Sequence, residues 1–152
     1  MAAAKYTSFM GDALALAEAA IAVGEVPVGA VIVRDGKIIG RGHNRTRIDQ
    51  DPTAHAEIVA IRQATQSLGN GRLEDCDLWV TLEPCTMCAG AIAHARIKRL
   101  YYAAEDPKGG AVDNGVRFFD APTCHHRPDV YTGLESERSA KLLLDFFRGR
   151  RD

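Results

Sequence analysis

Residues 76–104, CDLWVTLEPCTMCAGAIAHARIKRLYYAA, predict the unit on which the fold depends. The runs CDLWVTL and RLYYAA have the length and apolar content of strands, and EPCTMCAGAIAHARI between them is typical of a helix. Two strands that are joined through a helix in this way normally pair in parallel, by a right-handed crossover. The stretch therefore indicates an α/β domain.

The segment before this unit predicts two antiparallel strands. In VGAVIVRDGKIIGRGHN, residues 28–44, two β-rich runs flank Asp35 and Gly36, which are a strong signal for a two-residue hairpin turn. An antiparallel pair together with a parallel pair makes the expected sheet mixed. A helix from about Thr7 to Val23 should precede the hairpin and end at Gly24.

Two more helices are expected further along the chain. Asp51 can cap a helix whose first position is Pro52, so a helix should begin just ahead of HAEIVAIRQA, residues 55–64. Near the end, SAKLLLDFFRGRR, residues 139–151, predicts a helix that is apolar around much of its girth. Residues 106–115 form a glycine-rich loop, and residues 116–138 show no pattern that assigns them to an element.

The composition fits one globular domain over residues 1–152, with a hydrophobic content of 46%. No signal peptide or membrane anchor is expected, because the alanine-rich run near the N-terminus is short and interrupted by acidic residues. Four cysteines, two of them three positions apart, suit a reduced compartment and a metal or redox role, which indicates the cytoplasm. A net charge of −1 gives no general attraction for nucleic acid, so RNA would need a local basic patch.

Cys85 and Cys88 form the first candidate site. At positions i and i+3 of a helix they project to nearly the same side, and a helix N-terminus stabilises their thiolates. A C-x-x-C pair at the start of a helix is also typical of thioredoxin-like redox sites. His55 favours a metal, because it too lies at the start of a helix, and two helix N-termini can meet at one edge of a sheet.

Three protein ligands leave one corner of a zinc tetrahedron for water, which is the arrangement of a catalytic site. A structural zinc site needs a fourth protein ligand, and the remaining candidates lack the spacing that we expect: Cys76, His94, Cys124, His125 and His126. A second metal in TCHHRPD, residues 123–129, is disfavoured, because adjacent histidines on a strand point apart. No other role follows for the cysteine and histidines of that segment.

Glu57 is the candidate proton carrier. A zinc ion with two thiolates and a neutral imidazole has no net charge, so it acidifies a bound water less than a cationic site does and benefits from a nearby base. Residues two apart on an ideal helix diverge by about 200°, however. Spacing alone therefore does not place Glu57 beside a metal on His55.

The motifs HAE and TLEPCTMCAGA together resemble the zinc-dependent nucleobase deaminases, whose signature is H-x-E followed by P-C-x-x-C. Among these the chain is most similar to the bacterial tRNA-specific adenosine deaminases, over nearly its whole length. The resemblance is carried by EVPVGAVIV, HNRT, DPTAHAE, LEPCTMCAGAI, ARIKRLYYAAEDPKGGA and LLLDFFRGRR.

This resemblance implies a fold, a cofactor and a reaction. The fold is the cytidine-deaminase-like three-layer α/β fold, with a central five-stranded mixed sheet and helices on both faces. One zinc ion per chain would be held by His55, Cys85 and Cys88, and zinc-activated hydroxide would attack C6 of adenine while Glu57 shuttles protons. Ammonia would leave, and adenosine at the wobble position of a tRNA anticodon would become inosine. Asn44 would hydrogen-bond the flipped nucleoside; a turn asparagine after a strand is the alternative.

The resemblance also implies the partners. These are tRNA, through its anticodon stem-loop, and a second copy of the chain in a homodimer; no DNA and no membrane is expected. The small residues of CAGAIAHA, residues 88–95, could serve a dimer interface or pack within one subunit. Basic residues that could contact RNA phosphates are Lys108 in the glycine-rich loop and Arg148, Arg150 and Arg151 near the C-terminus.

Two other functions fit parts of the sequence. A free-base deaminase, in particular a guanine deaminase, shares the fold and a similar signature, but it has no need of an RNA-binding segment such as FFRGRR, residues 146–151. An inactive, zinc-stabilised RNA-binding module is the second alternative. Glu57 opposes it, because a structural zinc site has no use for an unliganded carboxylate.

Overall fold

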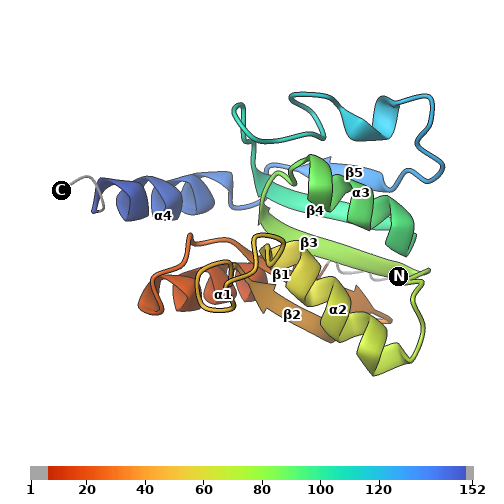
Figure 1. Ribbon diagram of the computed structural model, residues 1–152, viewed down its shortest axis with the longest axis horizontal. Coiled ribbons are helices and arrows are strands. Elements are labelled where there is room, and N and C mark those ends of the chain that lie inside the picture. Colours follow the sequence, from red (N-terminus) through yellow and green to blue (C-terminus); the bar gives the residue numbers. More distant parts are fainter. Residues whose placement is uncertain (1–6, 150–152) are drawn as a thin grey trace, which may run out of the picture.

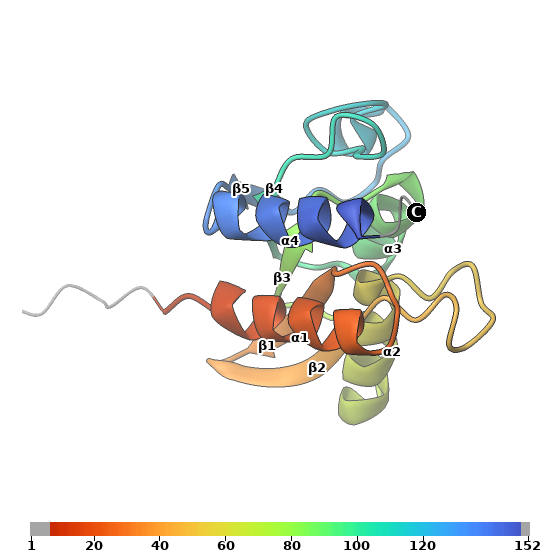
Figure 2. The ribbon, with the colours of Figure 1, turned by 90° about the vertical axis from the view of Figure 1, so that its left-hand side faces the viewer.

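The expected α/β architecture is confirmed: a five-stranded mixed sheet lies between two layers of helices (Figures 1 and 2). The computed structural model describes residues 7–149 of the chain. No helix in this part is long and apolar enough to cross a membrane. The elements are α1 (Met10–Ala22), β1 (Gly29–Arg34), β2 (Lys37–His43), α2 (Ala56–Leu68), β3 (Cys76–Leu82), α3 (Thr86–Ala95), β4 (Arg99–Ala104), the 3₁₀ turn η1 (Phe118–Asp120), β5 (Asp129–Thr132) and α4 (Ser136–Arg148).

The order of the strands in the sheet is β2-β1-β3-β4-β5. Strand β1 runs antiparallel to both of its neighbours, whereas β3, β4 and β5 are parallel. The hairpin between β1 and β2 turns at Asp35 and Gly36, which both have positive φ, at 50° and 74°. Such angles are those of the two-residue turns that match the twist of a hairpin. The β3–α3–β4 unit and the hairpin therefore form where the sequence predicts them.

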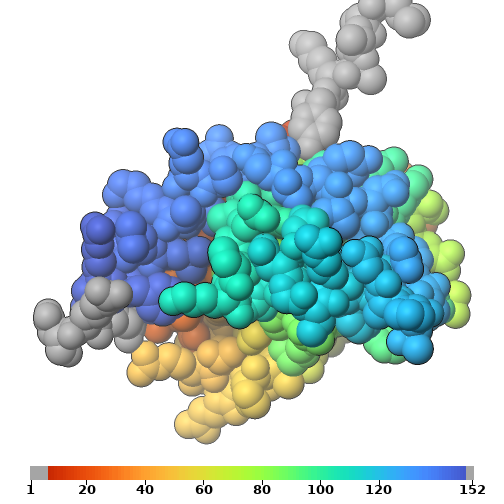
Figure 3. Space-filling view, turned by 90° about the horizontal axis from the view of Figure 1, so that it is seen from above, coloured from red at the N-terminus to blue at the C-terminus, as the bar shows by residue number. Residues whose placement is uncertain are grey.

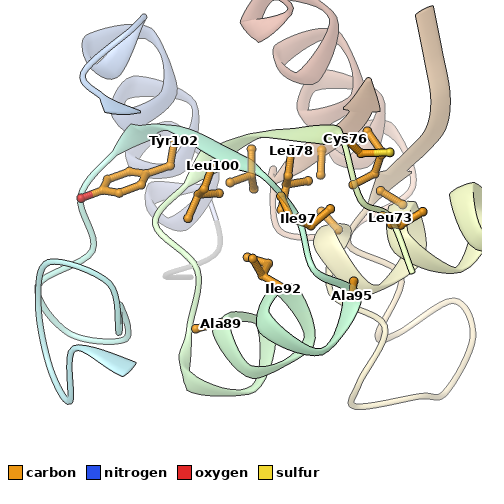
Figure 4. Close-up of a cluster of buried hydrophobic side chains, with 14 of the residues drawn as sticks. Leu73, Cys76, Leu78, Ala89, Ile92, Ala95, Ile97, Leu100 and Tyr102 are labelled. Carbon is orange, nitrogen blue, oxygen red and sulfur yellow. The ribbon is translucent and has the colours of Figure 1, made fainter. Parts of the chain in front are cut away.

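Alternate side chains of the central strands enter two separate cores. On one face, Leu78, Leu100 and Tyr102 pack with Ala89 and Ile92 of α3 (Figure 4). On the other face, α1 packs on the remaining strand positions, and this core contains Met10, Ala13, Leu14, Val31, Val33, Trp79, Tyr101 and Ala103. Because both faces are covered, the strands appear in the sequence as nearly continuous apolar runs.

Two glycines of β2 let α2 lie directly on the sheet. A Cβ atom at Gly40 would come within 2.4 Å of the carbonyl oxygen of Ala60, and one at Gly42 within 2.6 Å of that of Ala56. No side chain fits at such distances, so these positions set how closely α2 approaches β2. The N-terminus of α2 is thereby held at the edge of the sheet where β2 ends.

Helix α2 begins later than the sequence predicts. It starts at Ala56, with His55 as the residue before it, whereas Pro52 lies in a turn. The Asp51 side chain accepts hydrogen bonds from the backbone and the hydroxyl of Thr53, so it stabilises that local turn and does not cap the helix. The helix obtains its cap from a residue that is more distant in the sequence.

The C-terminal helix α4 is less buried than its apolar sequence predicts. Leu142 and Leu143 pack against the two cores, but Leu144 and Phe147 are 51% and 50% exposed. The reason is the position of the helix, which follows β5 and projects beyond the edge of the sheet (Figure 1). The body of the protein therefore covers α4 on one side only.

Residues 116–138, to which the sequence assigns no element, contain the turn η1, the strand β5 and the first residues of α4. Strand β5 pairs with β4 and supplies the fifth strand. In the space-filling view, this segment and the loop before it form much of one face of the molecule (Figure 3). A hydrogen bond of 2.7 Å between His126 Nε2 and the carbonyl oxygen of Ile97 ties the segment to the α3–β4 connection.

Candidate active site

Two helix N-termini meet at the edge of the sheet where β3 ends. His55 stands before α2 and Cys85 stands before α3, and both have an extended backbone, with φ/ψ of −72°/155° and −75°/177°. Cys88 follows in the first turn of α3. The structure thus brings together three residues that lie on two different helices.

The candidate ligand atoms lie close together, and the His55 nitrogen is equally far from the two sulfur atoms. His55 Nδ1 lies 3.6 Å from the Sγ atom of Cys85 and 3.6 Å from that of Cys88. All three atoms lie within 4.8 Å of one another. Within residues 7–149 this is the one group of three or more His, Cys, Asp or Glu side chains that could hold a metal ion, and it includes neither Cys76 nor Cys124.

The charge balance of the group favours a cation. The interactions with Cys88 and with His55 lower the pKa of Cys85 to about 4, against the opposing effect of burial. The contact with Cys85, together with burial, holds the pKa of Cys88 well above its ordinary value. Two sulfur atoms this close together repel each other when both are thiolates, so a positive charge between them stabilises the pair.

Glu57 lies beside this group. Because His55 precedes the helix with an extended backbone, the step of two residues to Glu57 is not that of an ideal helix. The Glu57 side chain is 4% exposed and interacts with Cys88. Burial raises the pKa of Glu57 to about 7, a range in which a carboxyl group can both accept and donate a proton near neutral pH.

A cavity of about 260 Å³ opens beside these residues. It combines apolar side chains, which can contact the face of a flat ring, with a few polar groups that can orient it. The residues that line the cavity are Val26, Val28, Asn44, His55, Glu57, Leu82, Glu83, Cys85, Asp106 and Gly109.

Asn44 is held by the start of α2. Its Oδ1 atom accepts a hydrogen bond of 2.9 Å from the N–H of Ala56, and α2 has no side-chain cap from its own preceding residue. Asn44 thus caps α2, although it lies 12 residues before Ala56 in the chain. A role limited to the local turn after β2 does not account for this bond. The Nδ2 group is then the part of the side chain that is left to donate to a ligand in the cavity.

Sequence reasoning misses Glu83, which also lines the cavity. Its side chain is 2% exposed and accepts hydrogen bonds from the backbone of Asp106 and of residues 112–114. Burial acts to raise the pKa of Glu83, but these hydrogen bonds and one from the Asn114 side chain outweigh burial and lower it. An acidic residue directly between a buried strand and Pro84 is the signal that could have pointed to it.

Two of the four side chains that are expected to contact RNA lie at the surface of the described part of the chain. Lys108 is exposed beside Gly109, which lines the cavity, and Arg148 is exposed in the last turn of α4. Arg150 and Arg151 lie outside the described residues.

The segment TCHHRPD does not form a second cluster of metal ligands. The Cys124 thiol donates to the backbone oxygen of His126, at 3.1 Å, and His126 itself binds the backbone of Ile97. The ring of His125 contacts that of His94, with centroids 5.3 Å apart. These contacts within the fold account for the segment.

A mixed five-stranded sheet that carries one histidine and two cysteines at two helix N-termini, with a buried glutamate beside them, defines the class of nucleobase deaminases. The family model for MafB19-like deaminases matches residues 5–151. The tRNA-specific adenosine deaminase of Agrobacterium fabrum is 60% identical over 148 residues, which make up 97% of each chain. The chain belongs to the family of tRNA-specific adenosine deaminases.

Solved structures show the same relationship. One structure, from a study of A-to-I editing by tRNA:A34 deaminases at the wobble position of transfer RNA, is 61% identical with a TM-score of 0.88, and the match covers 89% of this chain and 98% of that one. The guanine deaminase of Bacillus subtilis is 35% identical with a TM-score of 0.65, covering 96% and 95% of the two chains. The fold is shared by both, and the tRNA:A34 deaminase is the more similar of the two.

Proposed function

We propose that this chain hydrolyses adenosine to inosine at the wobble position of a tRNA anticodon. The observation that carries the proposal is the placement of Glu57 beside His55, Cys85 and Cys88 at one cavity, in a chain that is 60% identical to a tRNA-specific adenosine deaminase. Sequence identity supports the substrate, and the group of side chains supports the chemistry.

We assign one zinc ion per chain to His55 Nδ1 and to the sulfur atoms of Cys85 and Cys88. Tetrahedral zinc, with bonds of about 2.0–2.1 Å to nitrogen and about 2.3 Å to sulfur, separates these two kinds of ligand atom by roughly 3.5–3.6 Å. The two nitrogen–sulfur distances of 3.6 Å fit this requirement. Thiolate and imidazole ligands also favour zinc over magnesium and calcium, which prefer oxygen.

Zinc at this place supplies a Lewis acid that lowers the pKa of a water molecule. The carboxylate of Glu57 accepts a proton from the water that attacks C6 of adenine. The same carboxyl group then donates a proton to the amino group at C6, which departs as ammonia. Because Glu57 is buried, bulk water does not compete for the proton during these steps.

The cavity suits a single base that has been turned out of an RNA strand. Val26, Val28 and Leu82 offer an apolar surface to the ring, and Asn44 Nδ2 offers a hydrogen bond to the nucleoside. Enzymes that react with a base inside a stack must first flip it into such a pocket. The cavity therefore supports a single base as the reacting group, and the 60% identity to a tRNA-specific adenosine deaminase supports a base that belongs to RNA.

The proposed substrate is tested with the purified, zinc-loaded protein. It is offered an anticodon stem-loop with adenosine at the wobble position and, separately, free guanine, cytosine and adenosine, and inosine and ammonia are measured. We expect inosine in the stem-loop only, and none in a stem-loop whose wobble position carries guanosine. Ammonia from guanine alone would establish a free-base deaminase, and bound zinc without any turnover would establish an inactive RNA-binding module.

Simultaneous replacement of Arg148, Arg150 and Arg151 by alanine should weaken RNA binding through the loss of phosphate contacts. Each lost contact should reduce the slope of log affinity against log salt by about 0.7–0.9, with a similar effect on all RNA sequences. Fluorescence anisotropy titrations of the stem-loop at three salt concentrations measure the slope, and zinc content should stay constant.

The control for this variant is Lys37→Ala, which removes a positive charge from the exposed hairpin turn, at the opposite end of β2 from Asn44. It should leave the slope unchanged. If the triple variant also keeps the wild-type slope, the three arginines make no phosphate contacts with the stem-loop.

We further propose that residues 1–152 form one deaminase domain, which acts in the cytoplasm on tRNA and pairs as a homodimer without contacts to DNA or membrane. Ala89 and Ala93 of α3 are buried within the subunit, so they do not need an interface to explain them. Gly90 and Ala91 are half-buried and are the better candidates from that segment. Analytical ultracentrifugation of the zinc-loaded protein distinguishes a dimer from a monomer.

A further inference from the structure

The carboxylate of Glu83, the residue after β3, binds the loop of residues 105–117, which follows β4 and supplies two residues of the cavity. Its Oε1 atom accepts hydrogen bonds from the N–H of Asp106, at 3.0 Å, and from Asn114 Nδ2, at 2.6 Å. Its Oε2 atom accepts from the three consecutive N–H groups of residues 112–114, at 3.0, 2.9 and 3.0 Å. One buried side chain thus binds five donors of a single loop.

The backbone of Glu83 and Pro84 makes two further bonds, one to the end of β4 and one to the same loop. The N–H of Glu83 donates to the carbonyl oxygen of Ala104, at 2.8 Å, and the carbonyl oxygen of Pro84 accepts from Ala111, at 2.9 Å. A Cβ atom at Gly110 would lie only 2.4 Å from the carboxylate carbon of Glu83, so a glycine is needed for the loop to close on this group.

The loop contributes two residues to the cavity, Asp106 and Gly109. Asp106 also shapes its own turn, because its side chain accepts hydrogen bonds from the N–H groups of Lys108 and Gly109, at 3.1 and 3.0 Å. Cys85 also lines the cavity, and it follows Glu83 by two residues in the chain. The Glu83 carboxylate therefore helps to fix the position of the loop relative to Cys85, together with the backbone bond between Pro84 and Ala111.

We propose that Glu83 is a positioning residue for substrate binding: it holds the loop so that Asp106 and Gly109 form a wall against which the target nucleotide is placed. This role rests on the proposed function. The side-chain hydrogen bonds of Glu83 are all made to the loop, so Glu83 acts through the loop and not on the reacting atoms.

The variant Glu83→Gln tests this role with little change of shape. A glutamine must turn its NH₂ group toward one of the two sets of donors. The less costly orientation points the NH₂ group toward Asp106 and the Asn114 side chain, because the Asn114 amide can rotate and present its oxygen as an acceptor. The N–H of Asp106 then has no acceptor, whereas the N–H groups of residues 112–114 keep theirs. The hydrogen bond that is lost is therefore the one that holds Asp106, a residue of the cavity wall.

Two measurements follow on the zinc-loaded protein. Amide hydrogen exchange by NMR should show faster exchange at Asp106 than in the wild type, by about tenfold, as the loss of one hydrogen bond to a charged group predicts. KM for the anticodon stem-loop should rise by about tenfold while kcat stays within about twofold, because a binding surface is lost and the proton-transfer groups are not. Zinc content should be unchanged.

Gly110→Ala is the second variant, because it displaces the loop while the carboxylate remains, and it should reproduce the rise in KM. Glu25→Gln is the matched control. Glu25 is also a buried carboxylate, 1% exposed, but it accepts from the N–H groups of Arg47 and Ile48 in another loop. In that variant exchange should rise at Arg47 or Ile48 and not at Asp106.

Unchanged exchange at Asp106, a fall in kcat at constant KM, or a loss of zinc in Glu83→Gln would each overturn the positioning role. A wild-type protein that is active on the stem-loop, with an unchanged KM in both loop variants, would overturn this role alone. A wild-type protein that does not deaminate the stem-loop would overturn the proposed function together with it.

Discussion

Exchange of Glu57 for glutamine should leave the fold and the zinc in place and lower turnover of the stem-loop by at least about 10²–10⁴-fold. Glutamine has the size and shape of glutamate, but it cannot carry a proton from the attacking water to the leaving amino group. Because Glu57 is buried, no base from bulk solvent replaces it readily. Single-turnover kinetics and elemental analysis of the same preparation measure the two quantities.

The zinc content of Glu57→Gln decides how a loss of activity is interpreted. Loss of both zinc and turnover would mean that Glu57 supports the metal site, whereas we propose that it transfers protons and that His55, Cys85 and Cys88 hold the metal. A zinc-loaded variant with nearly normal turnover would remove Glu57 from the mechanism. Stem-loop binding, measured by fluorescence anisotropy, should remain close to that of the wild type, because the phosphate contacts are unaffected.

Replacement of Cys88 by alanine should remove the zinc and make deamination undetectable. The Cys88 side chain is fully buried, so no exposed group can take the place of its sulfur atom. His55 and Cys85 alone would offer two of the three protein ligands that a catalytic zinc site uses. A metal that binds the folded state also stabilises it, so the melting temperature should fall and should no longer respond to added zinc.

Cys76→Ala is the matched control for this prediction. Cys76 is also a fully buried free thiol, but it lies at the start of β3, where its thiol donates to the carbonyl oxygen of Glu74 at 3.6 Å. The variant should lose some packing and keep one zinc per chain. Full occupancy of zinc in Cys88→Ala would show that the ligands are wrongly assigned.

The elements around the site could be predicted because each has a local signal. The strands β3 and β4 are short apolar runs, and Asp35 and Gly36 adopt the positive φ angles that their residue types favour in a turn. The start of α2 could not be predicted, because the local cap signal of Asp51 and Pro52 competes with a cap supplied by Asn44. The position of β5 could not be predicted either, because its four residues are mostly exposed and carry no apolar pattern.

The candidate site, too, has parts that local sequence signals predict and parts that they do not. The sequence by itself determined the H-x-E and P-C-x-x-C motifs, and their place at two helix starts was enough to expect that His55, Cys85 and Cys88 could meet. Helix spacing did not place Glu57 and only the family resemblance implied its role; in the tertiary structure it lies beside Cys88, because the extended backbone at His55 changes the direction of the side chains that follow. The Glu83 carboxylate binds backbone donors 23 to 31 residues away. Such partners are selected by how strands and loops pack in space, and no local periodicity of the chain encodes them.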